Sequence, residues 1–224
     1  MLPNLEGTMK TKNDRTLLLT TIICLLPIVL ALIVYDRLPA QLAIHFDFAG
    51  KPDNYLPKNV AVFGLPAFMA AINWYSHFRL NNDPKNEMAS TTLKQFTKWL
   101  IPIGSVIVIP ITLFIAMGSP IPISIIATSM TGVIIVICGN YLPKCKRNYT
   151  LGIKLPWTLD NEDNWNKTHR FAGFVWVLGG ILFTISAFFS FAYAMIGIVV
   201  LLMVLPPIYS YLTYKYQLIK AKIS

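Results

Sequence analysis

The chain has 224 residues, of which 55% are hydrophobic and 13% are charged, and its formal net charge is +9. Soluble domains carry about 25% charged residues, so this composition excludes an ordinary soluble globular protein. Residues 99–143 and 171–214 contain no Lys, Arg, Asp or Glu. A transmembrane helix needs roughly 20 apolar residues, so each stretch is long enough to cross a bilayer twice. We therefore predict an all-α integral membrane protein.

Six apolar segments, taken in chain order, predict six transmembrane helices. The first is longer than the core of a signal peptide, and no cleavage site of small residues follows it, so we expect it to be retained. The chain could start at Met1 or at Met9, because the positive residues begin directly after Met9. The predicted spans are residues 16–35, 60–77, 99–117, 121–141, 171–189 and 192–214.

The distribution of positive charge predicts the orientation. Sixteen of the 19 Lys and Arg residues fall on one side of the six-span arrangement. By the positive-inside rule that side is cytoplasmic, and both termini lie there. The expected parts are a cytoplasmic tail (1–15), two spans (16–78) with an extracellular loop (36–59), a cytoplasmic loop (79–98), a four-span region (99–214) with a cytoplasmic loop (143–170), and a cytoplasmic tail (215–224).

The extracellular loop at 36–59 contains a strand-like segment. Apolar residues at the even positions from 42 to 48 alternate with polar or small ones, and this period of two predicts an extended strand. Gly50 and Pro52–Asp53 predict the turn that follows. Such a strand could bind a peptide by strand addition or through its apolar face. His45 and Asp47 suggest a metal or acid–base pair, but we expect neither role because a third ligand and a nucleophile are missing.

Within the predicted spans the polar residues are few and uncharged. The absence of intramembrane charge argues against an ion-coupled transporter. We expect Asn73, His77 and Asn140 to form hydrogen bonds with neighbouring helices rather than to bind a ligand. Pro206–Pro207 predicts a kink or local opening of the sixth helix. Small residues suited to close helix contact are Gly173, Gly179 and Gly180, and the residues expected only to pack are Cys24, Cys138 and Cys145.

The cytoplasmic loop at 143–170 is polar, basic on balance, and is predicted to end as a helix. Asp160 is the predicted N-cap, and two acidic residues follow in the first turn, where the helix dipole favours anions. Trp165 and His169 are four residues apart and therefore share one face. We expect Trp157 and Trp165 to anchor this segment at the lipid headgroups, as interfacial tryptophans do.

Both loops carry recognisable motifs. The stretch from Asn140 to Arg170, with G-N-x-L-P-K, then N-x-x-x-G-I-K-x-P-W-T-L, then W-x-x-T-H-R, resembles the signature of the SdpI family. That family comprises bacterial membrane proteins named for immunity to a secreted sporulation-delay peptide toxin. The outer loop, with L-P-x-x-x-x-x-H-F and G-K-P-D-x-Y-x-x-K, resembles the small domain of unknown function that commonly precedes this signature. Tyr55 stands where a tryptophan or a similar aromatic residue is expected, which is a mild departure.

The resemblance implies a multi-pass protein of the bacterial cytoplasmic membrane that protects the cell from a hydrophobic, membrane-active peptide toxin. It also implies signalling to a cytoplasmic transcriptional repressor. Membrane lipid surrounds such a protein, and we expect no cofactor and no direct binding to nucleic acid. The expected toxin-binding residues are His45, Phe46, Asp47, Gly50, Lys51, Asp53, Tyr55 and Lys58. The expected residues of the cytoplasmic signature are Asn140, Pro143, Lys144, Asn148, Gly152, Lys154, Pro156, Trp157, Thr158, Trp165, His169 and Arg170.

Other functions are open at this stage. Six spans and kinking prolines permit a small-molecule permease, although the sequence shows no internal repeat of the kind that transporters carry. A membrane sensor without a toxin partner is equally permitted. The sequence contains no paired Asp in a span, no G-x-S-x-G and no H-E-x-x-H, so we do not expect an enzyme.

Overall fold

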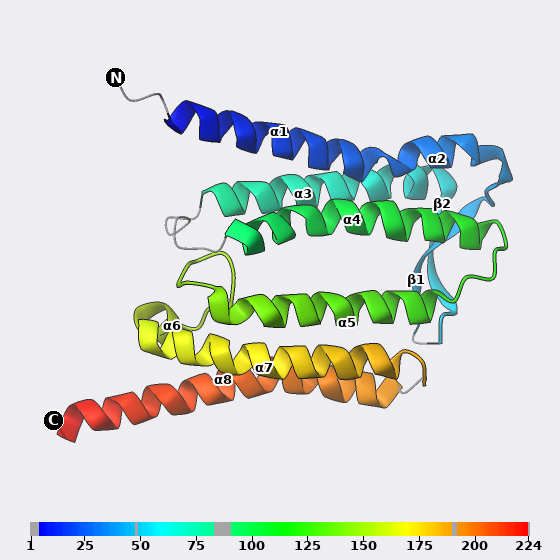
Figure 1. Cartoon of the computed structure of the whole chain (residues 1–224). Helices are drawn as coiled ribbons and strands as arrows, with labels where there is room; N and C mark the ends of the chain where they lie inside the picture. The colour runs from blue at the N-terminus through cyan, green and yellow to red at the C-terminus, as the bar shows by residue number, and fades with distance from the viewer. Residues whose placement is uncertain (1–4, 48, 83–90, 190–191, 224) are drawn as a thin grey trace. The chain divides into compact units, whose positions relative to one another are not determined.

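The computed structural model describes the chain at residues 5–47, 49–82, 91–189 and 192–223, and at residues 5–14, 91, 192 and 223 it describes the backbone alone (Figure 1). Three basic side chains used for the orientation, those of Lys10, Lys12 and Lys85, lie outside this description. The chain divides into two compact units. Unit 1 holds helices α1 to α4 and a β-hairpin, and unit 2 holds helices α5 to α8.

The described part of the chain contains five helices that are long and apolar enough to cross a membrane: Arg15–Ile33, Thr92–Ala116, Ile123–Lys144, Glu162–Ser186 and Tyr193–Lys222. The chain therefore fits a multi-pass membrane protein. The predicted second span is an α-helix of 17 residues, α3 at Leu65–Asn81, preceded by a π-helical turn at Val60–Gly64. This length is at about the lower limit for a transmembrane helix, so the six-span count and its orientation stay predictions.

In unit 1 a proline divides the first apolar segment into two helices, α1 at Leu5–Leu25 and α2 at Pro27–Ile33. Pro27 has no backbone N–H and cannot continue the hydrogen bonds of α1. Ser105, in α4 at Thr91–Ala116, donates a side-chain hydrogen bond of 2.8 Å to the carbonyl of Cys24. A neighbouring helix thus satisfies a carbonyl near the break, as spans with prolines require.

A buried polar cluster connects α1 to α3 within unit 1. Asn73 Nδ2 donates to Thr20 Oγ1 over 3.0 Å, and His77 Nε2 lies 3.2 Å from the same hydroxyl oxygen. All three side chains are fully buried. The predicted helix-to-helix hydrogen bonds are therefore confirmed for Asn73 and His77. Asn140 is exposed near the end of α5, and its contact stays a prediction.

The segment after α2 forms a two-stranded antiparallel hairpin, β1 at Gln41–Phe46 and β2 at Pro52–Pro57. The predicted strand is confirmed as β1, whereas the sequence did not predict its partner. Pro52 and Asp53, which we expected in the turn, already belong to β2. The turn lies before them: Asp47 N donates to the Lys51 carbonyl over 2.9 Å, and Gly50 takes a left-handed φ of 80°.

Unit 2 consists of three long helices with a short one at an end (Figure 1). Between α5 and α6 the chain makes a 3-10 turn at Leu142–Lys144 and then an irregular loop. The helices are α5 at Ile123–Tyr141, α6 at Pro156–Asp160, α7 at Glu162–Ser186 and α8 at Ala192–Ile223.

Helices α5 and α7 approach one another at two pairs of glycines. A Cβ atom on Gly139 would lie 3.0 Å from the carbonyl oxygen of Gly173, and one on Gly180 would lie 2.8 Å from that of Gly132. Gly179 faces a leucine of α8 instead. The predicted close helix contact is confirmed, and it allows the backbones to pack without intervening side chains.

Helix α8 runs without interruption through Pro206 and Pro207, so the predicted local opening is absent from the described helix. Pro206 lacks the N–H that would bond to the Leu202 carbonyl one turn earlier. Trp176 of α7 replaces it, because its indole Nε1 donates to that carbonyl over 3.2 Å.

Candidate functional site

The hairpin has a face toward the core of unit 1 and a face away from it. Leu42 is buried in the core, and Leu56, paired with it across the strands, packs against the same core. The next pair in register is Ala43 with Tyr55, whose side chain is 47% exposed. Strand alternation therefore places Leu42 and Leu56 on the core face and Tyr55 on the other face, where it is exposed although its partner Ala43 is buried.

A hydrogen-bonded His–Asp pair lies on that accessible face. His45 Nδ1 and Asp53 Oδ1 are 2.6 Å apart, with side chains that are 67% and 47% exposed. Asp47 does not pair with His45: its carboxylate accepts the backbone N–H of Lys51 over 2.8 Å and closes the turn. Among the described residues no three His, Cys, Asp or Glu side chains gather as metal ligands would.

Lys58 lies at the base of the hairpin and joins it to the preceding segment. Its ammonium group donates to the carbonyls of Tyr35 and Leu38 over 3.2 and 3.3 Å, and lies 4.4 Å from the centre of the Tyr35 ring. Lys58 thus stabilises the hairpin, while His45, Asp53 and Tyr55 form its accessible group. Phe46 is half-buried and Lys51 is exposed.

In unit 2 the signature loop is organised around Asn148, which is 1% exposed. Its Oδ1 accepts the backbone N–H groups of Thr150 and Leu151 over 2.9 and 2.6 Å. Its Nδ2 donates to the Lys146 carbonyl over 2.8 Å. An asparagine side chain that bonds to nearby backbone in this way fixes a turn, so the motif asparagine shapes the loop instead of facing a partner.

The next part of the loop packs on the start of α7. Trp165 is fully buried, stacks on His169 with ring centres 4.0 Å apart, and donates from Nε1 to the Cys145 carbonyl over 2.7 Å. The predicted headgroup anchor is therefore wrong for Trp165, which contacts protein on all sides. Gly152 approaches these rings with a φ of 105°, and a Cβ there would collide with the His169 ring.

The hydrogen bonds of His169 define its tautomer. Nδ1 donates to the Trp165 carbonyl over 2.8 Å, and Nε2 accepts the backbone N–H of Ile153 over 2.9 Å. The ring is therefore neutral, with its proton on Nδ1. His169 is 1% exposed. It joins the loop to α7 and has no room for a substrate.

Helix α6 starts at Pro156, a residue favoured at the first helical position. Thr158, fully buried, accepts the Leu155 N–H over 2.9 Å and donates to the Ile153 carbonyl over 2.9 Å. Lys154 reaches back to the Thr150 carbonyl over 3.2 Å. The P-W-T motif thus forms the start of a short helix.

Helix α7 is capped by Asn161, whose Oδ1 accepts the Asn164 N–H over 2.9 Å. The prediction of Asp160 as N-cap is wrong, because the chain forms α6 up to Asp160 and starts α7 one residue later. The two acidic residues predicted for the first turn, Glu162 and Asp163, are confirmed there.

A buried polar network that the sequence did not predict joins α7 to α8. Asn164 Nδ2 donates to the Ser210 carbonyl over 3.0 Å, and Ser210 Oγ donates to Asn164 Oδ1 over 2.8 Å. Thr168 donates to Asn164 Oδ1 over 3.0 Å, and Trp157 Nε1 donates to Ser210 Oγ over 2.9 Å. Ser210, a polar residue in an otherwise apolar span, was the available signal.

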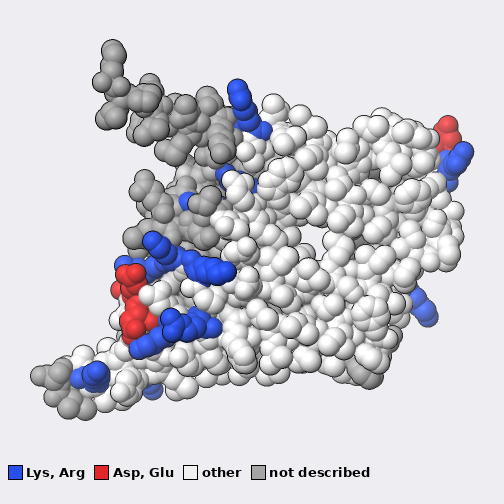
Figure 2. Space-filling view, in the orientation of Figure 1, with Lys and Arg blue, Asp and Glu red and all other residues white. Residues whose placement is uncertain are grey.

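The remaining residues of the predicted signature lie on the surface. The charged side chains of unit 2 gather at the end that carries α6 and the start of α7 (Figure 2). Along the rest of its helices the surface visible in this view is uncharged. Exposed members of the signature are Asn140, Pro143, Lys144, Lys154, Pro156 and Arg170. These surface residues, and not the buried ones, are available to a partner.

Comparison with known proteins matches both motif regions. Residues 144–210 match the model of the SdpI/YfhL protein family, and residues 22–70 match a domain of unknown function, DUF1648. The chain is 28% identical over 205 residues to the immunity protein SdpI of Bacillus subtilis (strain 168), covering 88% of this chain and 95% of that protein. No solved structure matches. The predicted resemblance to the SdpI family is confirmed.

Proposed function

We propose that this chain, a homologue of SdpI, is a membrane immunity protein that protects a bacterial cell from a secreted, membrane-active peptide. The observation that carries the proposal is the similarity to an immunity protein over 95% of that protein's length, through both the hairpin and the signature loop. The five long apolar helices support a location in the cytoplasmic membrane.

The hairpin is the proposed capture surface for the peptide. A sheet of two strands leaves an open edge on each strand, and an extended peptide can add to such an edge through main-chain hydrogen bonds. Strand β2 is exposed along almost its whole length, whereas β1 contributes Leu42 to the core. The edge of β2 is therefore the accessible one, with Asp53 and Tyr55 beside it.

Protection is tested by expressing the chain in a bacterium that is sensitive to secreted membrane-active peptides, with an empty vector as control. We expect higher survival with the chain than without it. Unchanged killing across a panel of sporulation-delay peptides and unrelated membrane-active peptides would contradict the proposal.

The capture surface is tested by replacing His45, Asp53 and Tyr55 together with alanine, leaving Asp47 in place because it closes the turn. We expect protection to be lost while the amount of protein in the membrane is unchanged. The matched control is Asn54→Ala, an exposed change on the same strand that leaves His45, Asp53 and Tyr55 in place. Full protection by the triple variant would remove the hairpin face from the mechanism.

Signalling to a cytoplasmic transcriptional repressor is the finer part of the proposal. The exposed basic members of the signature, Lys144, Lys154 and Arg170, are the groups available for docking on the side predicted to be cytoplasmic. Exchanging all three for glutamine should abolish peptide-dependent induction of a reporter gene without reducing survival. Induction that persists in this variant would exclude these residues from signalling.

A further inference from the structure

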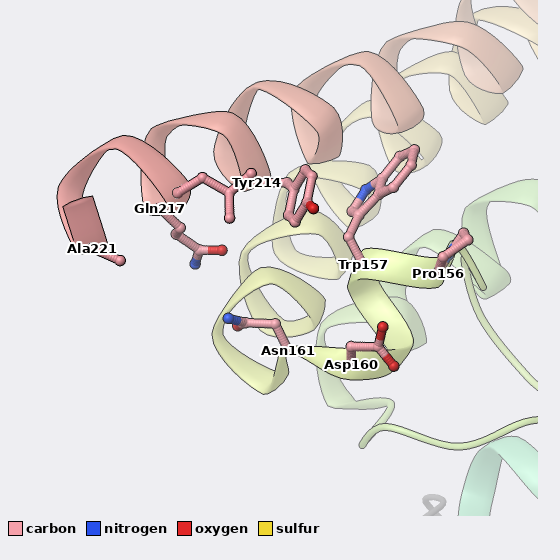
Figure 3. A pocket seen from close by; sticks show the side chains of 8 residues that line it. Pro156, Trp157, Asp160, Asn161, Tyr214, Gln217 and Ala221 are labelled. Carbon is pink, nitrogen blue, oxygen red and sulfur yellow. The ribbon is translucent and has the colours of Figure 1, made fainter.

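A pocket of about 390 Å³ opens between α6 and the last turns of α8, within unit 2 (Figure 3). Trp157 and Tyr214 form its aromatic wall, while Asp160 and Asn161 lie across from Gln217 of α8. The toxin-capture surface proposed above does not include this pocket, and no motif of the sequence analysis assigns it a ligand.

The aromatic wall is held in place before any ligand binds. Trp157 stacks on Tyr214 with ring centres 5.7 Å apart and an interplanar angle of 20°, and its indole N–H is fixed by Ser210. The centre of the Tyr211 ring lies 5.6 Å from that of Trp157, at an interplanar angle of 58°. Lys215 already places its ammonium group 5.1 Å from the centre of the Tyr211 ring. This cluster therefore presents rigid π-surfaces, which attract cations.

Two of the side chains that line the pocket carry an acceptor without a partner in the described part of the chain. Asp160 is exposed, and its carboxylate has no ion-pair or hydrogen-bond partner among the described residues. Gln217 Nε2 donates to the Asp163 carboxylate over 2.8 Å. The buried Oε1 of Gln217 has no hydrogen-bond partner in the described part of the chain. An unpaired carboxylate beside two π-faces favours a positively charged donor.

Three cations of the same end of unit 2 are engaged elsewhere. Arg147 donates from its guanidinium to the Leu159 carbonyl over 3.0 Å, and Lys167 pairs with Asp163 over 2.7 Å. Lys215 lies over Tyr211, as described above. None of these three cations pairs with Asp160, so its carboxylate is available to a cation from outside the described chain.

We propose that this pocket binds a guanidinium group, stacked on the Trp157–Tyr214 wall and hydrogen-bonded to the Asp160 carboxylate. A guanidinium is planar, stacks on aromatic faces and binds a carboxylate through two parallel N–H groups, whereas an ammonium group offers only a point charge. The source of the group is either an arginine side chain of a protein segment or a free guanidinium compound.

The test uses the full chain in lipid nanodiscs, labelled with fluorotryptophan and observed by fluorine NMR. Five tryptophans give a simple spectrum, and Trp157→Phe assigns the signal of the pocket. The probe is a capped pentapeptide with one central arginine among glycines, and its matched control carries citrulline, which is neutral and has nearly the same shape. We expect the arginine peptide to shift the Trp157 signal and to leave the buried Trp165 unchanged. A citrulline peptide that binds equally well would overturn the proposal.

Two pairs of variants separate a specific site from general attraction to negative charge. Asp160→Asn should weaken binding of the arginine peptide about fivefold or more, whereas Glu162→Gln, which removes an equally exposed charge outside the pocket, should change it less than about twofold. Tyr214→Leu should weaken binding and Tyr214→Phe should preserve it, because only the ring face is required. Equal losses for Asp160→Asn and Glu162→Gln would overturn the proposal.

A last comparison identifies the source of the guanidinium group. Arginine amide as the free probe should bind as tightly as the peptide if the pocket serves a small guanidinium compound. Tighter binding of the peptide assigns the pocket to an arginine of a protein segment. Binding of neither probe would overturn the proposal, which stands independently of whether the chain protects against a toxin.

Discussion

The hairpin at residues 41–57 and the signature loop at residues 142–160 both connect helices, and each lies in a region that a family model matches. They use their motif residues in opposite ways. The hairpin leaves His45, Asp53 and Tyr55 accessible, whereas the loop buries Asn148 and Thr158 almost completely. A motif rich in polar residues thus marks a surface in one region and an interior in the other, because buried backbone groups in an irregular loop need side-chain partners.

The contrast predicts that the largest loss of stability comes from the residue of α7 on which the loop packs. Trp165→Ala removes a fully buried indole together with its stacking and hydrogen bond, and should lower the free energy of unfolding by about 3–5 kcal/mol. Tyr55→Ala in the hairpin should change it by less than about 1 kcal/mol, because the ring is half exposed. Denaturant titration in detergent micelles measures both. Similar losses for the two variants would break the comparison.

The second prediction concerns the backbone at Gly152. Alanine there must adopt a left-handed φ and also place its Cβ against His169. We therefore expect Gly152→Ala to lower the free energy of unfolding by more than the about 1–3 kcal/mol that backbone strain alone costs. The matched control is Gly118→Ala, at a φ of 91° with open space around the new methyl group. Gly118→Ala should show only the strain. An equal effect at both positions would mean that the contact with His169 does not matter.

The third prediction isolates a single buried hydrogen bond. Thr158→Val keeps the shape of the side chain but leaves the Leu155 N–H without its acceptor, which should cost about 1–3 kcal/mol. The control is Thr131→Val in α5, where the exposed hydroxyl bonds only to its own helix at Ala127. The same titration should show almost no change for the control, and a stable Thr158→Val variant would show that water can replace the threonine.

The smallest effect on stability is expected for Asp53→Asn. The pair with His45 is exposed, and such pairs contribute about 0–1 kcal/mol. The proposed function nevertheless predicts weaker protection in a survival assay. If Asp53→Asn keeps both its stability and its protection, the pair with His45 has no part in binding the peptide. Tyr55 and the edge of β2 would then be the functional parts of the hairpin.

The apolar helices could be predicted from the sequence because length and hydropathy determine them. Strand β1 followed from its alternation, but β2 is bounded by Pro52 and Pro57 and has no alternating pattern, so only its pairing with β1 reveals it. The N-cap was placed one residue early at Asp160, since Asp and Asn are equally good caps and the sequence contains both.

The candidate site could be predicted only as a set of positions. The motifs indicated that Asn148, Thr158 and Trp165 matter, but an irregular loop has no periodicity from which burial can be read. Ser210 was missed because it meets Asn164 from 46 residues away in the chain. Long-range partners of this kind are visible only once the helices are packed.

The hydrogen bond from Trp176 to the Leu202 carbonyl has an evolutionary consequence. The indole is needed there because Pro206 has no amide hydrogen to donate to this carbonyl. A substitution at either of the two positions therefore changes which residues the other can accept. A relative with a residue other than proline at position 206 has a backbone N–H for the Leu202 carbonyl, so its position 176 is free to vary. A relative that keeps Pro206 but loses Trp176 has a Leu202 carbonyl without a hydrogen-bond donor inside the helix bundle. In an alignment of relatives, Trp176 and Pro206 should therefore be inherited or lost together.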